Sequence, residues 1–187
     1  MIATTVPTLE DLSAQIDALY GTEPTPQHVL DAALDVFAER MRALTVRQSW
    51  AGLIAAVETL GDEAKTIENR RRYTRFTGPL LIHSAAAMAD MGQLPADFRR
   101  LLHRVPERLQ ECSRILAVAR IAECHPYTPG CCDSPWAERA ARVWHWQIAD
   151  VRALPEPIPA KGRLGLWKPS RDLVGQVLQQ LAGAPHA

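Results

Sequence analysis

Short strand-like stretches alternate with helical segments of unequal length over residues 44–167, and this pattern limits the fold more than any other feature of the sequence. The clearest strand is predicted over residues 114–124 (RILAVARIAEC), a largely apolar stretch. Shorter strands are predicted at residues 44–47, 66–67, 80–83, 143–148 and 164–167. No regular strand–helix–strand repeat connects them, which argues against a doubly wound parallel sheet. The sequence therefore predicts an α+β fold whose short strands close into a small β-barrel, with helices over its openings.

Helices are predicted between these strands and after the last of them. Ser49 and Ser170 each precede a helical segment and are expected to cap helices over residues 50–58 and 171–182. Residues 85–110 are also helical in character, with breaks at a glycine and a proline. The sequence has no internal repeat and no long linker, so we expect these helices to pack on a single domain.

The first 43 residues differ from the rest of the chain in charge. They contain seven acidic residues against two arginines, a net charge of −5, whereas the whole chain is neutral. Their apolar spacing predicts two helices, the first ended by Gly21 and the second begun at Thr25-Pro26. We expect this helical N-terminal extension (1–43) to pack against a central domain (44–168) or to bind a protein partner. A C-terminal helix (169–187) follows the domain.

The composition favours a cytoplasmic protein that does not bind a membrane. No run of 18 apolar residues occurs, and the N-terminus lacks the basic start and apolar stretch of a secretory signal. Four cysteines in a chain of 187 residues do not suggest a disulfide scaffold. The zero net charge argues against a protein that coats nucleic acid, although residues 65–75 (KTIENRRRYTR) have a local charge of +4. Local charge, rather than the global balance, sets the field at a binding site.

Several short motifs follow one another in an order that is typical of one domain family. The first three are LTVRQSWA at 44–51, KTIENR at 65–70 and GPLLIH at 78–83. The later ones are SPW at 134–136, WHW at 144–146 and GLW at 165–167. Together they resemble the ASCH domain, in which a strand–helix unit leads to a Gly-x-Lys-x-x-Glu-x-Arg signature and then to a barrel strand. The resemblance covers residues 44–168 and implies a PUA-like barrel whose relatives handle RNA or modified nucleobases.

Lys65, Glu68 and Arg70 match the charged residues of that signature, while Glu63 stands at the position of its glycine. On a strand, Glu68 and Arg70 point to the same face, with Lys65 opposite or on the preceding turn. A lysine beside a carboxylate in a partly closed mouth can bind phosphate, or lose its proton and act as a base. The alternative interpretation is an ion-pair network on the surface.

Residues around the signature extend the predicted binding site. Arg71 and Arg72 offer guanidinium groups to phosphates and Tyr73 offers a ring for stacking, unless this run is a solvated loop. Trp50 could stack on a base or fill the barrel mouth, and His83 could line the cavity or belong to the core. The predicted nucleic-acid-binding residues are Trp50, Lys65, Glu68, Arg70, Arg71, Arg72, Tyr73 and His83.

The resemblance implies two main classes of function. A binding module would hold an unpaired base of RNA, or a nucleoside, in the barrel mouth. A metal-independent hydrolase of an acylated nucleoside such as N4-acetylcytidine would use Lys65, Glu68 and Glu123, the last as the counterpart of the family's catalytic glutamate. Glu68 stands where that subgroup has a nucleophilic threonine, and Thr66 is the nearest hydroxyl. Ribonuclease activity, which some relatives have, is a third hypothesis.

Cysteine and histidine also cluster, at Cys124-His125 and Cys131-Cys132. Thiolate and imidazole are ligands that zinc prefers. Adjacent ligands, however, are poor partners in a tetrahedral site, and no Cys-x-x-Cys spacing occurs in the sequence. We therefore expect loop or buried thiols here, with no metal and no other cofactor.

Overall fold

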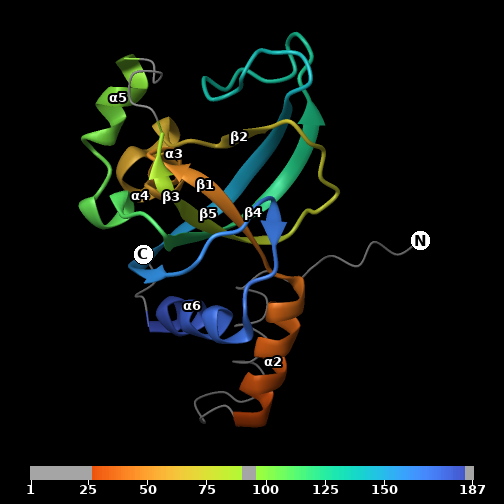
Figure 1. Ribbon diagram of the computed structural model, residues 1–187, viewed down its shortest axis with the longest axis vertical. Coiled ribbons are helices and arrows are strands. Elements are labelled where there is room, and N and C mark those ends of the chain that lie inside the picture. Colours follow the sequence, from red (N-terminus) through yellow and green to blue (C-terminus); the bar gives the residue numbers. More distant parts are fainter. Residues whose placement is uncertain (1–26, 90–95, 184–187) are drawn as a thin grey trace.

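The computed structural model describes residues 27–89 and 96–183, which fold around one six-stranded mixed sheet (Figure 1). The strands lie in the order β2-β5-β4-β3-β1-β6. Their bounds are Arg42–Gln48 (β1), Ile67–Arg70 (β2), Pro79–Met88 (β3), Arg114–Pro126 (β4), Trp144–Pro159 (β5) and Leu166–Trp167 (β6).

The long antiparallel pair β4 and β5 forms the centre of the sheet, and its register shifts at three places. Such bulges bend and twist the strands that contain them. β1 runs parallel to β3, and the chain between them forms two short helices and β2. β2 and β6 each pair on one side only, so the described strands do not close into a barrel. The α+β class is confirmed. The sheet of the described residues is open, however, and not the closed PUA-like barrel that was expected.

The helices form two groups in Figure 1, one beside the sheet and one below it. Their bounds are Gln27–Arg40 (α2), Trp50–Ala55 (α3), Val57–Leu60 (α4), Ala96–Leu102 (α5) and Arg171–Gly183 (α6), with 3₁₀ turns at Gly61–Glu63 and Glu107–Gln110. No helix within the described ranges is long and apolar enough to cross a membrane. The first helix predicted in the N-terminal extension, and the start of the second, lie outside these ranges.

The two predicted serine caps have different outcomes. Ser170 begins α6 as expected, since its Oγ accepts a hydrogen bond from the Leu173 backbone N–H at 3.2 Å. Ser49 precedes α3, but its side chain makes no capping hydrogen bond. The reason is its backbone, which has φ 78° rather than the extended conformation of a capping residue. The Ser49 N–H donates instead to Oε1 of Gln48, at 3.0 Å.

Two strands extend beyond their predicted bounds. Residues 85–88 belong to β3 and not to a helix, because β1 pairs alongside and holds this alanine-rich segment extended, with Gln48 opposite Met88. The helical part of 85–110 is therefore confined to α5 and a 3₁₀ turn. The proline-rich segment after residue 153 belongs to β5, where a register shift places Pro155 and Pro157 outside the ladder with β4.

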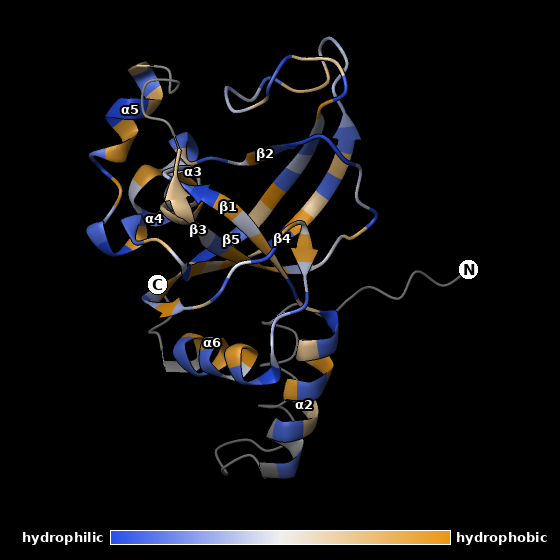
Figure 2. Ribbon diagram, in the orientation of Figure 1, coloured by the Kyte–Doolittle hydropathy of each residue, from blue (hydrophilic) through white to orange (hydrophobic). Residues whose placement is uncertain are grey.

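The sheet separates two apolar cores, which explains why its central strands are apolar on both faces. In β3, Leu80 and Ile82 enter one core and Leu81 enters the other. Figure 2 shows the resulting apolar stretches along the strands. The first core lies between the sheet and α3 to α5, and includes Leu53, Ile54, Leu116 and Ile121. The second lies between the sheet and helices α2 and α6, and includes Phe37, Met41, Val174 and Val177.

Helix α2 packs on α6 within the same chain, and we call this pair the helical base. Arg171 of α6 forms ion pairs with Asp31 at 3.2 Å and Asp35 at 2.6 Å. Lys168, just before α6, pairs with Glu39 at 2.6 Å. The acidic side chains of α2 therefore contact basic residues of the C-terminal segment. Of the two interpretations of the N-terminal extension, packing against the domain is the one observed for α2.

Candidate functional site

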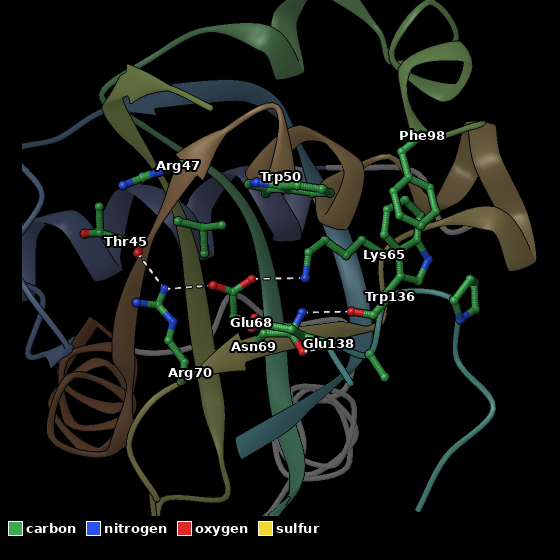
Figure 3. A pocket seen from close by; sticks show the side chains of 13 residues that line it. Thr45, Arg47, Trp50, Lys65, Glu68, Asn69, Arg70, Phe98, Trp136 and Glu138 are labelled. Atoms are coloured by element: carbon green, nitrogen blue, oxygen red, sulfur yellow. Dashed lines mark hydrogen bonds and ion pairs between the residues drawn. The ribbon is translucent and has the colours of Figure 1, made fainter. Parts of the chain in front are cut away.

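A cavity of about 560 Å³ opens beside β1 and β2, on the side of the sheet that carries α3 and α5. Its walls come from β1, the start of α3, the segment 65–70, Phe98 of α5 and the loop segment 135–138. Figure 3 shows charged side chains on one side of this space and aromatic rings on the other. Four of the predicted site residues, Trp50, Lys65, Glu68 and Arg70, line it together.

A chain of polar contacts crosses the floor of the cavity (Figure 3). Glu68 is its centre: one carboxylate oxygen lies 3.1 Å from Lys65 Nζ and the other lies 3.0 Å from Nη2 of Arg70. The same Nη2 donates to the backbone carbonyl of Thr45 at 2.8 Å. This side-chain bond connects edge strand β2 to β1, two strands that form no backbone hydrogen-bond ladder with each other.

Lys65 is held inside the protein, with only 4% of its surface exposed. Its backbone N–H donates to the Leu53 carbonyl, and its Nζ donates to the carbonyl of Ile67. Burial lowers the pKa of Lys65, because removal from water disfavours the ammonium form, while the Glu68 carboxylate opposes that shift. The ion pairs of the alternative interpretation therefore exist, but Lys65 and Glu68 are buried and not on the surface.

Three aromatic side chains form the opposite wall of the cavity. Phe98 and Trp136 stack with ring centroids 4.0 Å apart, and Trp50 meets Trp136 edge-on at 6.2 Å. The Nζ of Lys65 lies 5.8 Å from the Trp50 ring centroid. Flat apolar surface and ionised groups therefore face the same space, an arrangement suited to a ring with polar edges.

The loop that carries Trp136 is tied to β2 by one asparagine. Asn69 donates from Nδ2 to the Trp136 carbonyl at 2.8 Å and accepts from the Glu138 N–H at 3.0 Å. These bonds hold the loop segment that carries Trp136 against β2. Sequence reasoning missed Asn69 and Trp136 as site residues, although both lie inside the motifs KTIENR and SPW.

The arginine run after β2 lies at the rim and does not line the cavity. Arg71 is exposed and pairs with Glu138 at 3.1 Å. Arg72 is exposed, and its backbone carbonyl accepts a hydrogen bond from the Trp146 indole N–H at 3.0 Å. Tyr73 is half-exposed, with its ring 4.9 Å from that of Trp144. The run remains accessible on the outside of the site.

Two residues considered for catalysis stand apart from the cavity. Glu123 is exposed on β4, opposite Gln147, whereas Glu68 lies opposite Trp146. Because successive residues of a strand face opposite sides, Glu123 points away from the face of Glu68. Thr66 is exposed and also does not line the cavity. The structure therefore brings Lys65 and Glu68 together but not Glu123 or Thr66.

His83 belongs to the core rather than to the cavity. Its Nε2 lies 3.0 Å from the Ala160 carbonyl, and its ring meets Trp167 edge-on at 5.9 Å. Gly162 packs so closely that a Cβ there would lie 2.5 Å from Cε1 of the imidazole. Burial lowers the pKa of His83, with the Ala160 contact opposing the shift.

A scan against protein-family models gives no match, and a search of curated proteins finds no similar sequence. The resemblance to the ASCH domain therefore remains a prediction based on its motifs.

Proposed function

We propose that the cavity binds the base of a nucleotide in RNA, or of a modified nucleoside. The observation that carries this proposal is the combination of a buried Lys65–Glu68–Arg70 network with an aromatic wall in one cavity of about 560 Å³. That volume lies within the usual range for small-molecule sites, roughly 300–1,000 Å³. Aromatic surface stacks on any base, while donors and acceptors at the other side distinguish one base edge from another.

The polar groups of the network retain capacity for a ligand. Lys65 has three N–H donors, and its contacts with Ile67 and Glu68 engage two of them. Each oxygen of Glu68 receives one ion-pair contact and has a second lone pair available. A base that offers both an acceptor and an exocyclic amino group matches this pair of partners. The resemblance to the ASCH domain supports the same class of ligand.

The exposed arginine run supports RNA rather than a free base as the larger ligand. Arg71 and Arg72 lie immediately beyond Arg70, at the rim of the cavity. Guanidinium groups at such a position can hold the phosphates that flank a bound base. In this arrangement the cavity selects the base and the rim adds salt-dependent affinity.

The test is titration of the protein with short single-stranded RNAs and with free nucleosides. We expect Trp50→Ala to weaken RNA binding by about tenfold or more, the scale of removing one base stack. Arg71→Ala with Arg72→Ala should flatten the slope of log affinity against log salt by about 0.7 for each phosphate that is no longer bound. Arg104→Ala with Arg120→Ala is the matched control, because it also removes two exposed arginines, one of which, like Arg71, pairs with a glutamate. Equal binding by all these proteins would refute the proposal.

A hydrolase is the second candidate, and the lowered pKa of buried Lys65 is the observation that favours it. In that reaction Glu68 or the neutral Lys65 amine would take a proton from water, whose oxygen attacks the acetyl carbonyl carbon of N4-acetylcytidine. The C–N bond then breaks, the proton passes to the leaving nitrogen, and acetate and cytidine are released. Glu123 lies too far outside the cavity for the role that the resemblance implies.

Release of cytidine from N4-acetylcytidine would reveal this activity. We expect Lys65→Ala to abolish it and Glu68→Gln to slow it by about 100-fold, the scale of removing a general base. Inactive wild-type protein that still binds the nucleoside would refute hydrolysis and leave binding as the function. Cleavage of an RNA, but not of its 2′-deoxy counterpart, would identify a ribonuclease instead.

A further inference from the structure

Four side chains that the cavity does not use converge at the far end of the β4–β5 hairpin. His125 of β4 lies opposite His145 of β5. The loop between the two strands returns to bring Cys131 and Cys132 to the same place. The ligand atoms of His125, Cys131 and His145 all lie within 4.8 Å of one another. Cys132 Sγ lies 3.4 Å from Nδ1 of His145 and completes a set of two thiols and two imidazoles.

Three of the distances among these atoms match edges of a zinc tetrahedron. The two sulfur atoms are 3.7 Å apart, and they lie 3.5 and 3.4 Å from Nδ1 of His145. With zinc–sulfur bonds of about 2.3 Å and zinc–nitrogen bonds of about 2.0 Å, a tetrahedral site requires about 3.8 Å between sulfurs and about 3.5 Å between sulfur and nitrogen. Cys131, Cys132 and His145 therefore have the spacing of three ligands of one zinc ion, although adjacent cysteines in the sequence argue against such a site.

The second nitrogen of each imidazole is fixed in the way that metal-binding histidines require. Nε2 of His145 lies 3.0 Å from the Glu138 carbonyl, so it donates its hydrogen there and leaves the lone pair on Nδ1 directed at the sulfurs. Nδ1 of His125 lies 3.2 Å from the Pro126 carbonyl, which leaves Nε2 for the metal. A carbonyl behind a ligating histidine sets its tautomer and orientation.

The backbone of the loop explains how the cysteines are presented. The Cys131 N–H donates to the Thr128 carbonyl at 3.0 Å, and Gly130 has φ 78°. Proline followed by glycine at the centre of this turn is typical of type II. The turn sends Cys131 back toward the hairpin, while a bond from the Tyr127 N–H to the Val143 carbonyl closes the base of the loop at 2.8 Å.

We propose that His125, Cys131, Cys132 and His145 bind a zinc ion that fixes the loop of residues 127–143. Four protein ligands fill the tetrahedron, so the site is structural and has no open position for a substrate. The loop continues from Cys132 to Trp136 and Glu138, and His145 contacts the Glu138 carbonyl directly. The ion therefore positions the aromatic wall of the cavity. This inference concerns the metal alone and does not depend on the proposed ligand.

Zinc content of the full-length protein, produced without a histidine tag, tests the proposal. We expect about one zinc ion per chain by elemental analysis, and retention of it after dialysis against a weak chelator. Cys131→Ser with Cys132→Ser should lose the ion. Cys112→Ser with Cys124→Ser removes the same number of thiols from positions outside the cluster and should keep it. Cobalt in place of zinc should give the absorption of a tetrahedral ion with thiolate-to-metal charge transfer, and this should disappear in the first double variant.

Several results would overturn the site. One is metal-free wild-type protein that takes up neither zinc nor cobalt when each is added in excess. Another is equal zinc content in the two double variants. If Cys131→Ser with Cys132→Ser does not fold, His125→Ala serves instead, since it removes a partly exposed ligand and leaves both thiols in place. Wild-type affinity for cobalt, with an unchanged spectrum, in His125→Ala would refute the four-ligand site.

Discussion

The helical base and the cavity lie on different sides of the same sheet, and they place charged side chains differently. In the base, Arg171 and its two aspartate partners are about half exposed, while the surface between α2 and α6 is apolar. In the cavity, Lys65 is 4% exposed and the Glu68 side chain 11%, with apolar side chains behind them. The base keeps its ions in water, and the cavity keeps them out of it.

This difference shows where the chain departs from what stability alone favours. A buried ion pair is on average no more stable than apolar residues of the same volume, because both ions lose their hydration. The base shows that this chain can fill such a space with phenylalanine, methionine and valine. Charged residues retained at a buried position, around a cavity, are therefore better explained by ligand binding than by stability.

Glu68→Gln is expected to have the largest effect on stability. It leaves Lys65 and Arg70 close together without the carboxylate that both contact, so two positive groups remain poorly hydrated. Removal of one partner from a buried network lowers the free energy of unfolding by about 4 kcal/mol. Urea denaturation of variant and wild type gives the difference.

Glu138→Gln is the control for this prediction, because it breaks an ion pair with Arg71 at the exposed rim of the same cavity. Its effect should stay below about 1 kcal/mol. Similar losses of stability in both variants would mean that the Glu68 network behaves as a surface network, and the contrast with the base would disappear.

Met41→Ala is the corresponding change in the core between the helical base and the sheet, with an expected loss of stability of about 3 kcal/mol. Met41 is fully buried between α2 and β1, and its truncation leaves a void in the second core. Ligand affinity of the folded variant should equal that of wild type, because the sheet lies between this void and the cavity. Val36→Ala, at a half-exposed position of α2, should change stability by less than about 0.5 kcal/mol. A folded Met41→Ala protein with weakened ligand binding would show that the two regions are coupled.

The sequence predicted the parts of this molecule that depend on local pattern. Apolar runs identified β4 and the core of β3, and the spacing of Lys65, Glu68 and Arg70 identified the charged floor of the cavity. These features depend on residues close together in the chain, whose relative geometry a strand or turn largely determines.

The features of the fold and the site that the sequence did not predict depend on pairing between segments distant in the chain. The alanine-rich segment 85–88 has helical preference, but β1 alongside holds it as a strand. Asn69 reaches Trp136 across 67 residues, and His145 joins Cys132 across 13, contacts that no local pattern predicts. The side to which Glu123 points depends on a register shift between Ile121 and Glu123. A single-residue shift reverses a side chain's face, so a register error moves a residue into or out of a site.

His83, the buried histidine beside Trp167, should contribute to the change of the free energy of unfolding with pH. Burial puts its pKa in the folded protein below the unfolded value, which is about 6.5. The unfolded chain therefore takes up the proton first. The contribution of neutral His83 to stability is fully present above about pH 6.5. It is lost as the pH drops from there toward the folded pKa. His83→Gln should flatten this decline in a series of urea titrations. His103→Gln changes an exposed histidine, and an equal flattening there would show that the effect does not come from burial.

Arg171→Ala should have the smallest effect of the four, although it removes two ion pairs at once. Both aspartate partners are exposed on α2, and water can solvate the two carboxylates once the guanidinium is gone. Salt screens such pairs, with a Debye length of about 3 Å at 1 M, so any decrease in stability should vanish in high salt. Urea titrations at low and high salt measure this, and ligand affinity should not change at either. A decrease as large as that of Met41→Ala, or one that persists in high salt, would mean that the exposed ions hold α2 on the sheet and that the apolar core alone does not.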